Sequence, residues 1–176
     1  MQAIATEARW GSPRSRARLP VGLLPGLLLG LSLLASAIGS SLAAADEDFP
    51  RSALEIRSAQ GRQWLNIRIA DTPARQELGL MFQTRLPADE GMLFPQAQPR
   101  VMTMWMKNTY IPLDMLFIDS HGRIACLLAN TRPQSLEILT CPKPVKAVLE
   151  IGGGEAAERG IRVGDRVLHQ YFKNER

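Results

Sequence analysis

Short runs in which apolar and polar residues alternate are the feature that most constrains the fold of this chain. The first run is "ALEIRSAQGRQWLNIRIA", where Leu54 and Ile56 alternate with charged residues before Gly61, and Leu65 and Ile67 alternate with polar residues after it. Alternation with a period of two, broken by glycine, predicts two β-strands joined by a turn. Further strands are predicted at residues 92–95, 101–107, 113–118, 124–128 and 145–151, with "IRVGDRVLHQYF" completing the sheet.

Two segments interrupt the alternation and favour helices. In "DTPARQELG", Asp71 or Thr72 can cap a helix, Pro73 suits its first turn and Gly79 can end it. The segment "EAAER" predicts a second helix of one or two turns, ended by Gly160. Seven or eight short strands with two short helices indicate a mainly β fold, a compact sandwich or a partly closed barrel.

The first 45 residues have the order expected of a secretory signal peptide. Basic residues precede the apolar run "LPVGLLPGLLLGLSLLASAIG", and small residues lead to Ala45-Asp46, where we expect cleavage. An uncleaved membrane anchor remains the alternative, because the apolar run is long for a signal. We therefore expect a periplasmic or secreted protein, with no membrane span after cleavage. Residues 46–52 are predicted to be a short polar tail and residues 53–176 a single domain.

Charge outside the leader excludes one class of partner. The full chain has 21 Lys and Arg against 17 Asp and Glu, but four of the cations and one of the anions lie in residues 1–45. The remainder has 17 against 16, a net charge of +1. Nucleic-acid binding needs a clustered basic surface, so we expect no nucleic-acid partner.

The two cysteines, Cys126 and Cys141, are predicted to form a disulfide. An even pair in an exported chain is by default oxidised. Two separate buried thiols remain the alternative, because spacing alone does not show proximity.

Charged and amide side chains interrupt the otherwise apolar stretch "MWMKNTYIPLDMLFID". A buried carboxylate is costly unless it is paired or hydrogen-bonded, so these groups need partners. One hypothesis is that they converge on a polar pocket together with residues of the first helix and of the strand at 145–151. The other is a structural ion-pair network that fixes strand register. The candidate ligand-binding residues are Arg75, Trp105, Lys107, Asn108, Asp114 and Glu150.

The sequence gives little support to catalysis. It contains no G-x-S-x-G, H-E-x-x-H, C-x-x-C or P-loop pattern after the leader, and we assign no catalytic residue. The alternative to a binding module is an enzyme that acts on an envelope carbohydrate with Asp114 and Glu150 as acid and base. We predict no cofactor, because the G-x-G-x-x-A match at Gly152 precedes a helix too short for a dinucleotide fingerprint.

Alternating methionines raise a minor alternative, copper binding. Met102, Met104 and Met106 share one face of the predicted strand at 101–107, and thioethers are soft ligands that suit Cu(I). The same alternation also arises from core packing, where methionine fills irregular gaps. We therefore assign no metal ligand.

Three segments resemble the family known as domain of unknown function 192 (DUF 192). They are "ARQELGLMFQTRLPADEGMLF", "MWMKNTYIPLDMLFID" and "AVLEIGGGEAAERGIRVGDRV", within residues 65–168. The resemblance implies a compact, mainly β, jelly-roll-like fold, often exported, with no established activity. Cys126 departs from the family pattern, so the disulfide would be a local feature. The matching family-typical positions are Arg75, Gly79, Met81, Gly91, Met92, Trp105, Lys107, Asn108, Asp114, Glu150 and Gly164.

These observations together predict an exported, non-catalytic β-domain of the cell envelope. Its polar cluster within apolar strands favours binding over turnover. The expected partner is a small molecule or an envelope protein, whose identity the residues do not specify.

Overall fold

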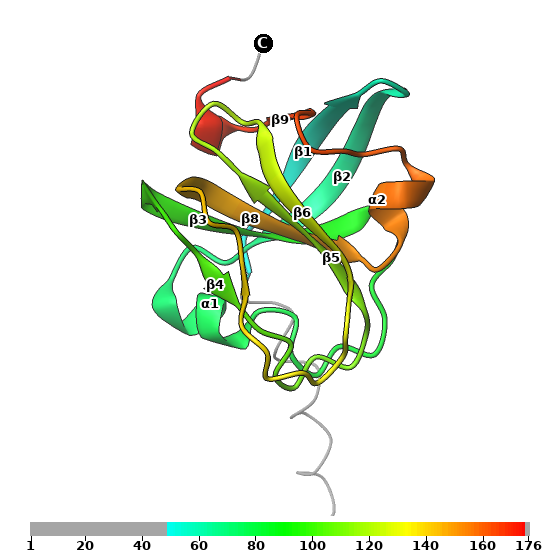
Figure 1. The fold of residues 1–176 in the computed structure, drawn as a ribbon, viewed down its shortest axis with the longest axis vertical. Coiled ribbons are helices and arrows are strands. Elements are labelled where there is room, and N and C mark those ends of the chain that lie inside the picture. Colours follow the sequence, from blue (N-terminus) through cyan, green and yellow to red (C-terminus); the bar gives the residue numbers. More distant parts are fainter. Residues whose placement is uncertain (1–48, 175–176) are drawn as a thin grey trace, which may run out of the picture. The chain divides into compact units, whose positions relative to one another are not determined.

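Strands are the main secondary structure in the computed structural model, which describes residues 49–174. The predicted signal peptide, residues 1–45, lies outside these residues. Two α-helices and one 3₁₀ helix accompany nine strands, so the prediction of a mainly β fold with two short helices is confirmed (Figure 1). The elements are β1 Arg51–Ser58, β2 Gly61–Ile69, α1 Pro73–Leu78, β3 Glu90–Arg100, β4 Thr103–Met104, β5 Leu113–Ile118, β6 Ile124–Thr131, β7 Leu139–Thr140, β8 Val145–Gly152, α2 Glu155–Glu158, β9 Arg166–Leu168 and η1 Gln170–Phe172.

Seven strands form one sheet in the order β6-β5-β8-β3-β2-β1-β9, and β4 pairs with β7 in a separate sheet of two strands. Neighbours in the large sheet are antiparallel except β2 and β3, which run parallel. The edge strands approach one another at an isolated bridge between Arg123 and Arg166, beyond the named ladders. The large sheet is strongly curved but not closed. Together with the β4–β7 pair on one side of it, it forms a sandwich-like fold (Figure 1).

Local sequence signals place α1 as predicted. The Thr72 hydroxyl accepts a hydrogen bond from the Arg75 backbone N–H at 3.2 Å, which makes Thr72 the N-cap, and Pro73 occupies the first turn. Gly79 ends the helix with a φ of 47°, a conformation that glycine adopts without a steric penalty. The cap, the proline and the terminal glycine therefore all act where the sequence indicates.

Three strand boundaries differ from the predictions. The predicted strand at residues 101–107 shrinks to Thr103–Met104, because the Met106 backbone N–H donates to the Ser135 carbonyl of a loop. Pairing with β8 extends β3 well beyond the expected residues 92–95. The first strand begins at Arg51, inside the segment expected to be a polar tail, because Arg51 pairs with Arg68 of β2.

The two faces of the large sheet bury separate apolar clusters. Leu149 and Ile151 of β8 belong to a core that β1, β2 and α2 also supply. Val148 of the same strand belongs to a second core, which includes Phe94 and Met115 and lies on the side of β4 and β7. Because side chains alternate along a strand, each polar residue in β5 or β8 is assigned to one face by its position.

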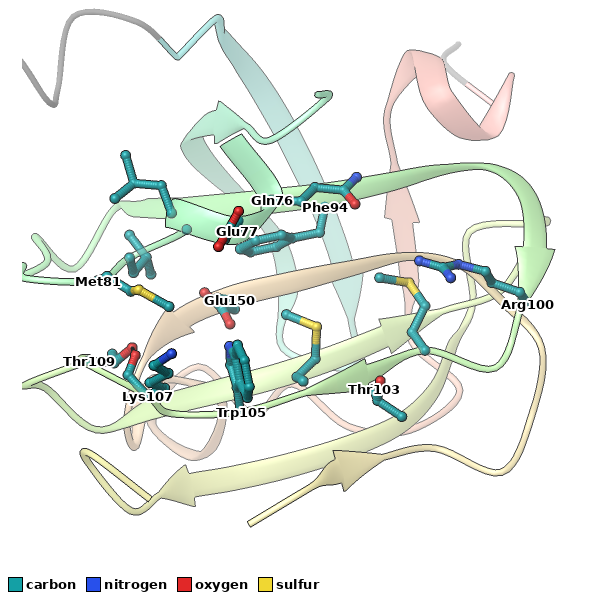
Figure 2. A pocket seen from close by; sticks show the side chains of 15 residues that line it. Gln76, Glu77, Met81, Phe94, Arg100, Thr103, Trp105, Lys107, Thr109 and Glu150 are labelled. Carbon is teal, nitrogen blue, oxygen red and sulfur yellow. Dashed lines mark hydrogen bonds between the residues drawn. The ribbon is translucent and has the colours of Figure 1, made fainter. Parts of the chain in front are cut away.

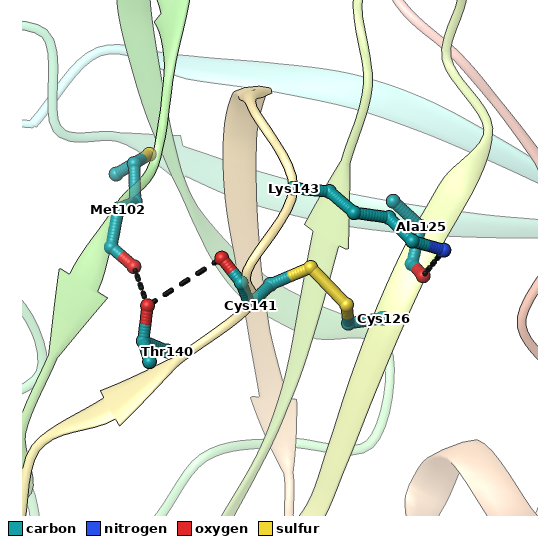
Figure 3. The surroundings of a disulfide bond; sticks show 6 residues. All are labelled: Met102, Ala125, Cys126, Thr140, Cys141 and Lys143. Atoms are coloured by element: carbon teal, nitrogen blue, oxygen red, sulfur yellow. Dashed lines mark hydrogen bonds between the residues drawn. A yellow bond between two sulfur atoms is a disulfide. The ribbon is translucent and has the colours of Figure 1, made fainter.

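A disulfide joins the small sheet to the large one, as predicted. Cys126 of β6 bonds to Cys141, which directly follows β7, with the two Cα atoms 5.9 Å apart (Figure 3). Beside it, the Thr140 hydroxyl donates to the Met102 carbonyl at 2.9 Å. The covalent link attaches the β4–β7 pair to the large sheet, and the hydrogen bond joins β7 to the residue before β4. Among residues 49–174, no helix combines the length and the apolar character needed to cross a membrane.

Candidate functional site

A pocket of about 120 Å³ lies between α1, the segment from Arg100 to Thr109, and β8 (Figure 2). The helix and the loop after it form one wall, and β4 with its flanking residues forms the other. Glu150 of β8 lies at the base. The lining residues are Gln76, Glu77, Leu78, Gly79, Leu80, Met81, Phe94, Arg100, Met102, Thr103, Met104, Trp105, Lys107, Thr109 and Glu150.

Glu150 is the most unusual residue of the pocket. In the ladder of β8 it lies opposite Met92 of β3 on one side and Met115 of β5 on the other, so thioethers flank it within the sheet. Glu150 is only 4% exposed to solvent. Burial raises the pKa of this carboxyl to about 8, since removal from water disfavours the charged form. Among the described residues, none donates a hydrogen bond to the carboxyl or forms an ion pair with it.

Trp105 and Lys107 form the wall opposite α1. Both residues are exposed at the mouth of the pocket, and Trp105 is 48% exposed to solvent. The Lys107 ammonium lies 5.1 Å from the centroid of the Trp105 ring, within the range of a cation–π contact. Lys107 therefore interacts with the indole rather than with a carboxylate.

Asn108 connects the two walls at one end of the pocket. It has a φ of 55°, which asparagine tolerates better than most residues. Its carbonyl accepts the Phe82 backbone N–H at 2.9 Å, and its side-chain amide lies 3.8 Å from the Met81 sulfur. Asn108 thus ties the turn after β4 to the loop after α1 and positions the pocket without lining it.

Asp114 lies on the opposite face of the sheet from Glu150. It pairs in register with Ile151, whereas Met115 pairs with Glu150, so the two carboxyl side chains leave the sheet in opposite directions. The Asp114 side chain is completely buried and accepts backbone N–H groups of Asn130, Gly154 and Ala156 at 2.7, 3.0 and 2.8 Å. The arrangement in which Asp114 and Glu150 flank one substrate bond does not occur.

Arg75 also lies outside the pocket. Its guanidinium pairs with Asp71, one turn earlier in the chain, at 2.7 Å. Of the six candidate residues, the structure brings Trp105, Lys107 and Glu150 to one pocket and places Asn108 beside it, outside the lining. Their role in ligand binding remains a prediction, and the structure gives Asp114 a structural set of hydrogen bonds.

The methionines divide between the pocket and the core. Met102 and Met104 line the pocket together with Met81. Met106 is fully buried elsewhere, and its sulfur lies 3.1 Å from the Thr131 hydroxyl, which donates to it. Within residues 49–174, no group of three His, Cys, Asp or Glu side chains could hold a metal ion. The thioethers of Met81, Met102 and Met104 contribute soft, adaptable apolar surface to the pocket.

Sequence reasoning missed several lining residues. Gln76 and Glu77 belong to a helix predicted correctly, but its orientation over the sheet follows from packing. The ring of Phe94 lies 3.2 Å from where a Cβ on Gly79 would be, so a larger residue there would crowd the wall. Arg100 stands at the far end of a strand that the sequence predicted to be shorter. A glycine after a short amphipathic helix was the one available signal for the close approach.

Comparisons with known proteins agree with the fold. Residues 55–169 match the model of the DUF192 family, which is described as "Uncharacterized ACR". A crystal structure of a protein of unknown function from Novosphingobium aromaticivorans DSM 12444 is similar, with 38% identity and a TM-score of 0.69, covering 71% of this chain and 89% of that one. A protein from Sinorhizobium meliloti 1021, described as a "putative transcription regulator", has 37% identity and a TM-score of 0.68, covering 70% and 96%. A comparison with curated proteins found no match.

Proposed function

This chain belongs to the DUF192 family, which is uncharacterised, and from that premise we propose that it is a non-catalytic binding module of the cell envelope. Its ligand would be a small molecule, or the end of a larger one, held in the pocket between α1 and the β4 wall. The observation that carries the proposal is Glu150, a buried carboxyl without a partner among the described residues, at the base of a pocket.

The composition of the pocket supports binding. Ligand sites combine mostly apolar walls with a few polar groups that fix orientation, and perturbed titratable groups cluster in them. Here the lining mixes aromatic, thioether and aliphatic side chains with polar and charged ones, and the acid at the base is Glu150. A pocket of about 120 Å³ is somewhat smaller than the cavity of about 150 Å³ that holds benzene, so it suits a ligand group no larger than that.

Catalysis finds less support in the geometry. General acid–base chemistry of the glycosidic type needs two carboxyl groups across one cleft. Asp114 and Glu150 leave the sheet on opposite faces, so they do not supply that pair. The pocket offers a single buried acid, and we propose recognition without turnover.

An envelope location is part of the proposal. The Cys126–Cys141 disulfide supports it, because disulfides persist in oxidising compartments. The leader, with its expected cleavage at Ala45-Asp46, points the same way. N-terminal sequencing of the protein recovered from a cell-envelope fraction should begin at Asp46, and recovery of an uncleaved chain in the cytoplasm would contradict export.

The role ascribed to the Sinorhizobium meliloti relative does not enter the proposal. A regulator that binds DNA needs a basic surface. Outside the leader this chain has 17 basic against 16 acidic residues, which provides no excess for phosphate contacts. We therefore expect no retention on DNA at moderate salt.

Ligand-detected unfolding tests the binding proposal. The protein would be screened against amines, sugars, short peptides and carboxylates, with the thermal midpoint as the readout. A ligand of the pocket raises the midpoint of the native protein, because it stabilises only the folded state. The variant Trp105→Ala, which removes a wall at an exposed position, should abolish the shift, whereas Trp64→Ala, at an exposed tryptophan outside the pocket lining, should retain it. No shift with any class would contradict the proposal.

A further inference from the structure

We propose that the pocket recognises a small organic ammonium ion, whose cationic head pairs with the Glu150 carboxylate while its alkyl part contacts the aromatic and thioether walls. This inference rests on the proposed binding function and names the class of ligand. Three features of the described residues lead to it: the unpartnered acid, the composition of the walls and the balance of charge around the mouth.

The unpartnered acid comes first. A buried carboxyl is stable in its ionised form only with a compensating charge or with several hydrogen bonds. The other buried carboxyl groups have partners: Asp114 has three backbone donors, Glu55 has Arg57 at 2.6 Å, and Glu155 has Arg159 at 3.2 Å. Glu150 has no such partner among residues 49–174, although Lys107 and Arg100 line the same pocket. The place of its counter-ion is therefore available to a ligand.

The walls suit an organic cation. Trp105 and Phe94 supply π-faces, which attract ammonium groups within about 6 Å. Lys107 shows that the Trp105 ring accepts such a contact, since its own ammonium lies 5.1 Å from the ring centroid. Met81 and Met104 add polarisable thioethers that pack against an alkyl chain.

The charged residues around the mouth of the pocket favour a cationic ligand. The charged groups facing the pocket besides Glu150 are Glu77 on α1, Arg100 at the end of β3 and Lys107 after β4. Arg100 donates to Gln96 at 2.8 Å and Lys107 lies against Trp105, so both cations have other contacts. When Glu150 is ionised, the lining has two negatively charged and two positively charged side chains. A bound ammonium is then the favourable addition, because it faces the one carboxylate held out of water.

The protonation of Glu150 gives a sharp signature. Its pKa of about 8 means that the pocket acid is mostly neutral at neutral pH. An ammonium ion binds best to the carboxylate, so binding displaces a proton and the affinity rises as the pH increases toward and past the pKa. A hydrogen-bond acceptor that needs the neutral acid would show the opposite dependence. The sign of the pH dependence therefore separates the two kinds of ligand.

The test uses three probes of similar size: butylammonium, 1-butanol and butanoate. Dissociation constants would be measured by NMR from the Trp105 indole N–H, assigned with Trp105→Phe, at about pH 6 and about pH 9. We expect butylammonium to bind at least about tenfold more tightly at the higher pH, since a full pKa unit corresponds to a tenfold change. At the higher pH, we expect butylammonium to bind at least about tenfold more tightly than 1-butanol.

Two variants control the experiment. Glu150→Gln should abolish the preference for the cation and its pH dependence while still binding 1-butanol, which shows that the pocket is folded. Glu155→Gln removes another buried acid, outside the pocket lining, and should leave both properties intact.

Several outcomes would overturn the inference. Butylammonium binding no tighter than 1-butanol, an affinity that falls with rising pH, or a cation preference that survives in Glu150→Gln would each do so. If only 1-butanol or butanoate binds, the cation class is wrong and the pocket remains a ligand site. If none of the three perturbs Trp105, this inference fails, and the wider ligand screen still decides the proposed function.

Discussion

Glu150 and Asp114 show how neighbouring strands of one sheet give two carboxyl groups opposite environments. The Asp114 carboxylate accepts hydrogen bonds from backbone N–H groups of Asn130 in β6 and of Gly154 and Ala156 at the start of α2. Glu150 faces methionines of the adjacent strands and a pocket. A carboxylate that is hydrogen-bonded on every side stabilises the fold, whereas one without partners costs stability when it ionises.

The stability of the protein should therefore fall as pH rises through the titration of Glu150. The pKa of its carboxyl is raised from 4.5 to about 8 in the folded state. Between these values the folded chain holds a proton that the unfolded chain has lost, so the free energy of unfolding decreases with pH by up to about 1.4 kcal/mol per unit. Glu150→Gln should remove the contribution of this one proton to the slope, measured by urea unfolding across this pH range. An unchanged slope would show that Glu150 does not titrate there.

Replacing Asp114 should have a large, structural effect. In Asp114→Asn one acceptor oxygen becomes an amide donor, which leaves at least one buried backbone N–H unpaired. We expect a loss of about 3 kcal/mol in the free energy of unfolding, measured with urea. Asp119→Asn is the matched control, because Asp119 caps an exposed turn through His121 and Arg123. A comparable loss in both variants would contradict the special role of Asp114.

At the scale of elements, the wall of the pocket depends on a short pair of strands. β4 and β7 have two residues each, too few to be stable by their own hydrogen bonds. The disulfide attaches them to the large sheet, and the Thr140 hydrogen bond to the Met102 carbonyl ties the pair together. The position of Trp105 therefore depends on a covalent link that is remote from it in sequence.

Removing the disulfide should weaken both stability and the pocket. The bond closes a loop with a sequence separation of 15, which the chain-entropy model values at about 3 kcal/mol. We expect Cys126→Ala combined with Cys141→Ala to lose about that much in urea unfolding. The double variant should also show a broadened Trp105 indole resonance.

Reductant provides the control for that measurement. It should destabilise the native protein by a similar amount and have no effect on the double variant. Equal stability of the oxidised protein and the double variant would contradict the proposed role of the bond.

At the scale of the molecule, the large sheet and the pocket wall differ in how they are supported. β8 is central, between β5 and β3, and buries residues on both faces. β4 and β7 contact only one side of the sheet and expose part of their residues. Ligand-binding elements are commonly drawn from such less stable regions.

Amide hydrogen exchange should resolve this difference. We expect backbone amides of β8 and β5 to exchange only through the largest openings. Amides of β4 and β7 should exchange faster by roughly two or more orders of magnitude, because they open locally. The comparison is made by NMR on the native protein, and uniform protection across both sheets would contradict it.

The sequence by itself determined the local elements and the chemistry of the candidates. Alternation predicted β1 and β2, and the strands expected at residues 113–118 and 145–151 match β5 and β8. The Thr72 cap and Gly79 predicted α1, and the even cysteine pair predicted the disulfide that forms. These predictions succeed because capping, turn and burial preferences act over a few residues. The resemblance to the family was also readable, since it depends on residue identity in a few segments.

Only the tertiary structure decided which polar residues meet. Parity places Asp114 and Glu150 on definite faces of their own strands, but strand order and register determine whether those faces coincide. Here the ladder of β5 with β8 separates them. The Gln76 side chain of α1 donates to the Pro95 carbonyl of β3 at 3.0 Å, and this packing brings Glu77 and Phe94 to the same pocket as Trp105. Such contacts depend on the packing of the whole chain, and no local pattern encodes them.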